Sequence, residues 1–318
     1  MPLSRRALLR NAALSAVALA VPSSLAACTG SEASLDSRDE PSSRDPVSDP
    51  DRDRLLAWTA VLRREQLVEG GVPLGRAAAR VGELAAGTPY EAFTLEAYLR
   101  EGGSPSRTEP LTLSLTRFDC VSLVEACLAV ARVANADATP TWERFGAEME
   151  RMRYRGGVRR AYDSRLHYFS EWIADGASRG LLRDLGADLG GEADRRPLRF
   201  MGEHPDSYPA LADPEVLEEI RAMERRLDDS PRMVVPTARI PLVSGQIESG
   251  DILAFATSIP GLDVTHSAFA YRGEDAVLRV LHAPLSGGVV EVTGATLPEY
   301  VAGIRSATGI LVARPMPD

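Results

Sequence analysis

The chain has 318 residues, a formal net charge of -9 at pH 7 and 44% hydrophobic side chains. This length and composition are sufficient for one large globular core or two closely packed lobes. The acidic balance argues against nucleic acid as a partner, because binding to phosphate backbones needs a cationic surface. No lysine occurs in the sequence, which excludes Schiff-base chemistry and a lysine general base.

The N-terminal segment has the pattern of an export signal. Ser4-Arg5-Arg6-Ala7-Leu8-Leu9 resembles a twin-arginine signal, and the apolar stretch after it, 12–20, is too short to span a bilayer. Leu25-Ala26-Ala27-Cys28 then matches a lipoprotein box, in which Cys28 is acylated. We therefore expect a signal at 1–27 and an exported protein that is lipid-anchored to the bacterial membrane on its periplasmic or extracellular face. The alternative is a simple cleaved signal with a chance cysteine.

Residues 28–53 are rich in Ser, Asp, Pro and Arg and have almost no large apolar side chains. A segment of this composition buries too little surface to order itself, so we expect a disordered tether followed by one folded domain at 54–318.

Helical patterns fill the first half of this domain. Apolar spacing and capping residues predict helices at about 51–68, 73–87, 119–130, 139–152, 167–178 and 213–227. The helix at 213–227 is highly charged, and we expect it to be a solvated outer element. Residues 112–115 alternate briefly between apolar and polar side chains and predict a short strand.

The second half has the pattern of short strands separated by Gly, Pro and Asp. Helices followed by a run of strands indicate an α+β fold, with a mainly antiparallel sheet packed on the helix that carries Cys120. The predicted strands are 233–236, 251–257, 265–271, 277–282, 289–292 and 310–314.

Cys120 is the candidate nucleophile. It directly follows the capping residue Asp119 and directly precedes an apolar helical stretch, so its sulfur is expected at a helix N-terminus. The helix dipole there favours negative charge and lowers a thiol pKa, and a thiolate can act in covalent catalysis. Cys127 lies too far along the same helix to form a disulfide with Cys120, about 10 Å, and is expected to be an inert core residue. The alternative for Cys120 is a buried structural cysteine.

Two histidines far downstream fall in predicted strands, His266 and His282. A cysteine on a helix followed by histidines on a sheet resembles the layout of papain-like hydrolases. The remaining histidines, His167 and His204, are as consistent with satisfied, partly buried side chains as with substrate contacts.

Several motifs in chain order carry a closer resemblance. They are Gly87-Thr88-Pro89-Tyr90, Phe118-Asp119-Cys120, Arg153-Tyr154-Arg155-Gly156, the stretch 164–169, Phe200-Met201, His204-Pro205, Gly250-Asp251-Ile252-Leu253, the stretch 261–266, and His282. Together they resemble the NlpC-type papain-like cell-wall hydrolases, and more closely a branch described as N-acetylmuramoyl-L-alanine amidase-like, long catalogued as a domain of unknown function. The resemblance covers about 55–314. Two departures are Ser267-Ala268 after His266, where related enzymes often carry glycine, and Ala283-Pro284 after His282.

The resemblance implies amide hydrolysis through a thioester, without a metal or organic cofactor. Cys120 would attack the carbonyl, and His266 would take the thiol proton and return it to the leaving amine. His282 would hydrogen-bond the far nitrogen of His266 and fix its tautomer. The backbone N–H of Cys120 and the hydroxyl of Tyr90 would stabilise the oxyanion.

Arg155, Arg165, Tyr168 and Asp263 complete the predicted substrate-binding set. Arginine pairs bidentately with carboxylate, so Arg155 and Arg165, with Tyr168, are candidates to bind the carboxylates or sugar of a muropeptide. The alternative is an internal ion-pair network.

The expected function is cysteine-dependent hydrolysis of peptidoglycan or muropeptides, and the resemblance implies the bond between the muramic lactyl group and L-alanine. Cleavage between D-glutamate and the diamino acid is the first alternative, and a non-catalytic, lipid-anchored muropeptide-binding protein is the second. A zinc amidase is disfavoured because no two histidines have the close spacing typical of zinc hydrolases.

Overall fold

The computed structural model describes residues 49–135, 137–284 and 288–317. The predicted signal, Cys28 and most of the predicted tether lie outside the described residues. The compact unit begins at Pro50, where a helix starts ahead of the expected domain boundary at 54. No helix within the described ranges is long and apolar enough to cross a membrane.

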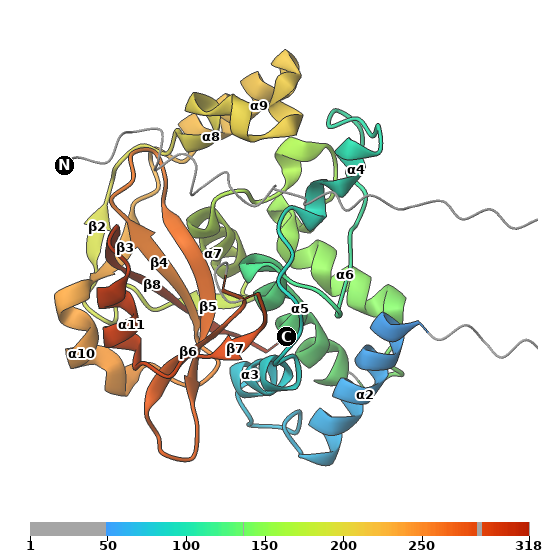
Figure 1. Ribbon diagram of the computed structural model, residues 1–318. Coiled ribbons are helices and arrows are strands. Elements are labelled where there is room, and N and C mark those ends of the chain that lie inside the picture. The colour runs from blue at the N-terminus through green and yellow to red at the C-terminus, as the bar shows by residue number, and fades with distance from the viewer. Residues whose placement is uncertain (1–48, 136, 285–287, 318) are drawn as a thin grey trace, which may run out of the picture. The chain divides into compact units, whose positions relative to one another are not determined.

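One antiparallel sheet dominates the C-terminal half of the described chain (Figure 1). Its strands follow the order β2-β3-β8-β4-β5-β6-β7, with β1 paired to β8, and each pair is antiparallel. The expected α+β fold with a mainly antiparallel sheet is therefore confirmed. The strands are β1 (Leu182–Asp184), β2 (Glu192–Asp194), β3 (Arg232–Pro236), β4 (Ile252–Thr257), β5 (Val264–Arg272), β6 (Leu278–His282), β7 (Glu291–Val292) and β8 (Ala307–Pro315).

The longer helices agree with the predicted ones in place and order. They are α2 (Pro50–Arg64), α3 (Leu74–Leu84), α5 (Cys120–Asn135), α6 (Trp142–Arg153), α7 (Phe169–Ser178) and α9 (Pro214–Arg226). Shorter helices that the sequence analysis did not predict are α4 (Ala97–Arg100), α8 (Phe200–Glu203), α10 (Ile240–Val243) and α11 (Leu297–Gly303). Single 3-10 turns lie at Thr94–Glu96, Arg155–Gly157, Tyr162–Ser164, Pro205–Ser207, Pro209–Ala212, Thr237–Arg239 and Ser244–Gln246.

Helices cover both faces of the sheet around β4 and β5. Ile252, Ala254 and Phe269 pack in one core with helices α3 and α5, whereas Leu253 and Phe255 pack in a second core with α10 and α11. Figure 1 shows α3 and α5 on one side of these strands and α10 and α11 on the other. All six residues of β4 are buried for this reason, as expected for a strand covered on both faces.

The predicted strand at 112–115 is wrong. Its backbone groups pair with side chains rather than with a neighbouring strand. The Leu115 N–H donates to Asp51 Oδ1 at 2.6 Å, and Arg153 Nη1 donates to the Thr112 carbonyl at 2.7 Å. These side chains provide the hydrogen-bond partners that a neighbouring strand would otherwise supply to the backbone.

Helix α9 is only partly the solvated element that its charges predicted. Asp213 caps it by accepting from the Glu215 N–H at 3.0 Å, as the sequence indicates. Val216, Ile220 and Met223, however, are buried in a third core cluster with Tyr162 and Tyr168. The helix therefore covers a separate apolar layer.

Gly250 and Gly75 bring the loop before β4 against helix α3. Gly250 has φ +90°, and a Cβ added there would lie 1.9 Å from the Gly75 carbonyl oxygen. Gly250→Ala should therefore destabilise the fold by about 3 kcal/mol, through backbone strain and a clash that no side chain can relieve. Calorimetry should show a fall in Tm of about 5–10 °C. Gly245→Ala, which meets nothing within 4 Å, is the matched control; equal Tm values for the two variants would contradict this close approach.

Candidate active site

Reciprocal capping fixes the first turn of α5. The Ser122 N–H donates to Asp119 Oδ1 at 2.7 Å, and the Asp119 N–H donates to Ser122 Oγ at 2.9 Å. This is a capping box in which serine takes the place of the usual Glu or Gln. The predicted capping role of Asp119 is confirmed, and Cys120 is the first residue of the helix.

The extended segment that contains Tyr90 runs beside Phe118, the residue before Asp119. The Phe118 N–H donates to the Pro89 carbonyl at 3.1 Å, and the Glu91 N–H donates to the Phe118 carbonyl at 2.9 Å. Burial raises the pKa of Tyr90, and the charges of Cys120 and Asp119 raise it further. The Tyr90 hydroxyl therefore stays protonated and can donate near the sulfur.

His266 on β5 and His282 on β6 form a hydrogen-bonded pair. Their rings meet at 75°, with His266 Nε2 2.8 Å from His282 Nδ1. Phe255 stacks on His266, with ring centroids 5.8 Å apart. Because Nε2 of His266 is engaged by His282, its Nδ1 is the nitrogen left to exchange a proton with a reacting group.

The Cys120 sulfur lies against the residue that follows His266. Ser267 is 1% exposed and lies close enough to Cys120 for its backbone N–H to act on the pKa of the thiol. Burial raises the pKa of Tyr300, and a charge on Cys120 raises it further; the Tyr300 hydroxyl is 3.3 Å from His282 Nδ1. The structure thus brings the start of α5 to the strand pair that carries the two histidines.

The expected lowering of the Cys120 pKa is wrong. Burial of the sulfur and the nearby charge of Asp119 outweigh the donors from Ser267 and the helix end, and they raise the thiol pKa to about 11. Burial and the neighbouring His282 lower the pKa of His266 to about 3. At neutral pH the resting site therefore holds a neutral thiol and a neutral imidazole.

Tyr300 and Glu291 are site residues that sequence reasoning missed. Tyr300 lies edge-on to the His282 ring, with centroids 5.2 Å apart, and Glu291 Oε1 lies 3.8 Å from His282 Nε2. Tyr300 lies on α11, which begins with a capping box between Thr296 and Glu299. This pattern is visible in the sequence and could have predicted the helix that carries Tyr300.

A cavity of about 220 Å³ opens beside Cys120. Phe93 on its wall is 38% exposed and has φ +59°, a left-handed backbone that bulky residues rarely adopt. Exposed aromatic surface held in a strained conformation at a cavity is typical of a binding position. The lining residues are Tyr90, Ala92, Phe93, Leu95, Glu96, Asp119, Cys120, Val121 and Arg165.

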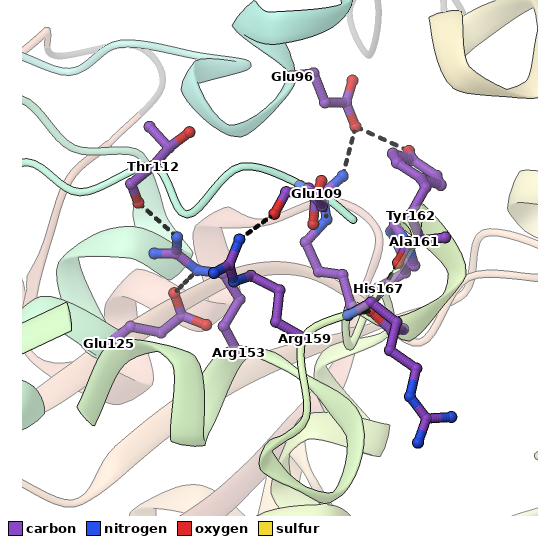
Figure 2. A network of polar contacts seen from close by, with 12 residues as sticks. Glu96, Glu109, Thr112, Glu125, Arg153, Arg159, Ala161, Tyr162 and His167 are labelled. Carbon is purple, nitrogen blue, oxygen red and sulfur yellow. Dashed lines mark hydrogen bonds and ion pairs between the residues drawn. The ribbon is translucent and has the colours of Figure 1, made fainter. Parts of the chain in front are cut away.

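Arg165 belongs both to this cavity and to a buried polar network. Its guanidinium donates to Glu96 Oε1 at 3.0 Å and lies 3.5 Å from Glu109. Figure 2 shows Glu96 also accepting from the Tyr162 hydroxyl, at 2.9 Å. Arg165 therefore reaches the cavity with its charge already balanced by carboxylates. A neighbouring pair, Arg153 and Glu125 at 2.8 Å, continues the network toward α5 (Figure 2).

The other predicted substrate-binding residues have internal partners. Arg155 pairs with Glu171 at 2.6 Å, and the Tyr168 hydroxyl donates to Glu224 at 2.7 Å. Asp263 Oδ2 accepts from the Ser170 N–H at 2.8 Å, in the first turn of α7. Arg155, Tyr168 and Asp263 do not line the described part of the Cys120 cavity. Their placement corresponds to the internal-network alternative.

The two remaining histidines are satisfied by backbone carbonyls. His167 Nε2 is 2.8 Å from the Tyr162 carbonyl, and His204 Nδ1 is 2.8 Å from the Phe200 carbonyl. Among the described residues, no group of three His, Cys, Asp or Glu side chains is arranged to hold a metal ion.

Comparison with known protein families identifies the family of this chain. The model of the AmiA-like family, described as N-acetylmuramoyl-L-alanine amidase-like, matches residues 80–310. The chain belongs to this family. A search of curated proteins finds no match.

Solved structures support the same assignment. An N-acetylmuramoyl-L-alanine amidase from Bacteroides uniformis is 31% identical, with a TM-score of 0.69 over 76% of this chain and 98% of that one. A Legionella pneumophila protein assigned to the DUF1460 family is 18% identical, with a TM-score of 0.59 over 84% of this chain and 94% of that one, and it shares the fold.

Thiol chemistry tests the electrostatics of the resting site. Because the pKa of Cys120 is raised to about 11, its alkylation by iodoacetamide should accelerate about tenfold per pH unit between pH 7 and 10. Asp119→Asn keeps a good N-cap and removes the negative charge, so it should lower the pKa and accelerate alkylation at pH 8. Cleavage after Glu125, which lies between the two cysteines, lets mass spectrometry follow Cys120 separately from the buried Cys127. A rate independent of pH from 6 to 9 would instead indicate a resting thiolate–imidazolium pair.

Proposed function

We propose that this protein is a cysteine amidase that cleaves peptidoglycan or its muropeptides, with an NlpC-type, papain-like arrangement of Cys120, His266 and His282. The observation that carries the proposal is the 2.8 Å hydrogen bond between the two histidines, on the strands next to a capped helix that begins with a cysteine. Each member supplies one role of a cysteine–base–orienter set. Membership of the amidase-like family supports the substrate class.

The neutral resting pair defines the first chemical step. The Cys120 sulfur attacks the amide carbonyl carbon while His266 Nδ1 takes the thiol proton, so charge develops only as the new C–S bond forms. The Cys120 N–H and the Tyr90 hydroxyl are the donors for the oxyanion, and one such donor is commonly worth about 3 kcal/mol. His282 keeps the Nε2 proton of His266 in place through this step.

Collapse and hydrolysis then complete the turnover. The C–N bond breaks, and His266 gives its proton to the leaving amine, leaving a thioester on Cys120. A water molecule attacks the thioester and gives a proton to His266 Nδ1. When the C–S bond breaks, the acid product leaves, and the sulfur recovers that proton.

The favoured bond joins the lactyl carboxyl of muramic acid to L-alanine. Its support is the description of the family and the name of the Bacteroides uniformis relative. We also propose that the protein is exported and held at the membrane by a lipid on Cys28, because 1–27 has both halves of a lipoprotein export signal.

Digestion of purified muropeptides tests the activity and the bond together. Free stem peptides beginning with L-alanine support the amidase, whereas peptides beginning with the diamino acid indicate a stem-peptide endopeptidase. Cys120→Ala should lower turnover about 10⁴-fold or more while muropeptide binding remains. Cys127→Ala, seven residues along the same helix, is the control and should keep wild-type turnover. Turnover that survives Cys120→Ala, or that is abolished by EDTA and restored by zinc, would contradict the proposal.

The cavity wall supplies a prediction about substrate binding. Phe93→Ala removes exposed aromatic surface beside Cys120 without touching the reacting groups, so KM should rise about 5–30-fold with kcat nearly unchanged. Leu242→Ala, at a residue of α10 that is 80% exposed, is the control. Steady-state kinetics on one muropeptide give KM and kcat for the two variants and the wild type. A fall in kcat with unchanged KM would show that Phe93 acts on the chemistry instead.

A further inference from the structure

The outer nitrogen of His282 is a buried polar atom without a hydrogen bond in the described chain. His282 is 2% exposed, and its Nε2 makes no hydrogen bond, while its Nδ1 bonds His266. The carboxylate of Glu291 lies close to this nitrogen, with Oε1 3.8 Å from Nε2. A neutral imidazole carries one proton on one of its two nitrogens, so this neighbour bears on which nitrogen holds it.

The sheet itself sets this contact. His282 and Glu291 are directly opposite each other in the register of β6 and β7, and side chains of such a pair lie on the same face. The Glu291 side chain is 48% exposed, whereas that of His282 is 2% exposed. The carboxylate is therefore partly hydrated at the sheet edge, with one oxygen turned toward a buried ring.

The two possible tautomers differ in their consequences for His266. If His282 holds its proton on Nε2, its Nδ1 accepts from His266 Nε2–H, and His266 Nδ1 is free to take the thiol proton. If His282 holds its proton on Nδ1, it donates to His266 Nε2, and the proton of His266 must be on Nδ1. In that second state His266 cannot act as a base toward Cys120.

We propose that Glu291 is a positioning residue that acts through His282 and selects the productive tautomer. Its negative charge attracts a proton on Nε2 and would repel the nitrogen lone pair that the other tautomer places there. The inference rests on the proposed function, since it concerns the same histidine pair. It adds a fourth member to a relay that runs from Cys120 through His266 and His282 to the edge strand β7.

The other groups around the ring do not make this selection. Tyr300 lies 3.3 Å from Nδ1, and its hydroxyl can donate to that nitrogen or accept from it, so it tolerates both tautomers. The titratable groups that face His282 are His266 on β5, Tyr300 on α11 and Glu291 on β7. Glu291 is the one carboxylate among these three.

The test uses the full-length protein with ¹⁵N-labelled histidine, which has four histidines to assign. Nitrogen chemical shifts should show His282 protonated on Nε2 in the wild type. In Glu291→Leu the shifts should move toward the Nδ1–H form, and kcat should fall about tenfold with little change in KM. Glu291→Gln keeps an acceptor oxygen without the charge and should lie between the two. Glu274→Leu, at an exposed acid in the turn between β5 and β6, is the matched control and should match the wild type.

The outcomes distinguish failure of the role of Glu291 from failure of the proposed function. Unchanged His282 shifts and unchanged kcat in Glu291→Leu, with Cys120→Ala still inactive, would overturn the role of Glu291 and leave the proposed function intact. A wild type without any Cys120-dependent turnover would overturn the proposed function, while the nitrogen shifts would still decide the tautomer. If Glu291→Leu does not fold, Glu291→Gln decides by the same two readings, with wild-type values counting against the role of Glu291.

Discussion

The packing of the first turn of α5 against strand β5 is the contact on which the rest of the site depends. Nearly every residue of α5 from Ser122 onward is buried, so the helix cannot shift without opening the main core. The Asp119 cap fixes where the helix begins, and Ser267 fixes where its first residue meets the sheet. The histidine pair lies on β5, which packs against α5, and on the neighbouring strand β6. The candidate site is held by elements of regular secondary structure, which position groups more accurately than loops.

Burial determines the electrostatics of this site more than the helix end does. Low solvent access disfavours both charged forms, raising the pKa of Cys120 and lowering that of His266. Asp119 stabilises the helix as its cap, yet its charge works against a thiolate one residue away. At neutral pH the Cys120 thiol and the His266 imidazole are therefore both uncharged at rest. The raised pKa also slows oxidation of the Cys120 thiol, since the reactive form is the thiolate.

Local patterns were sufficient for the longer helices and most strands, and they placed the candidate residues Cys120, His266 and His282 on the elements where the structure has them. Tertiary contacts explain where local patterns failed. The Asp119 cap, the helix of Cys120 and the strands of His266 and His282 all follow from short-range signals in the sequence. The segment 112–115 lacks its predicted strand because Asp51 and Arg153, distant in the chain, satisfy its backbone. The sign of the Cys120 shift and the internal partners of Arg155 and Tyr168 depend on packing density, which periodicity does not encode. Glu291 meets His282 through strand register, and that requires knowing which strands pair.

Rapid-quench mass spectrometry of the wild-type protein during muropeptide turnover tests the central claim most directly. The account predicts a transient thioester on the peptide that contains Cys120, with the added mass of a muramyl acyl group if the lactyl–alanine bond is cut. A heavier adduct at the same sulfur, muramyl-L-alanyl-D-glutamyl, would move the cleavage site but keep the nucleophile. Steady turnover with no acyl adduct on Cys120 at any quench time, and with full activity in a chain lacking that thiol, would contradict the account.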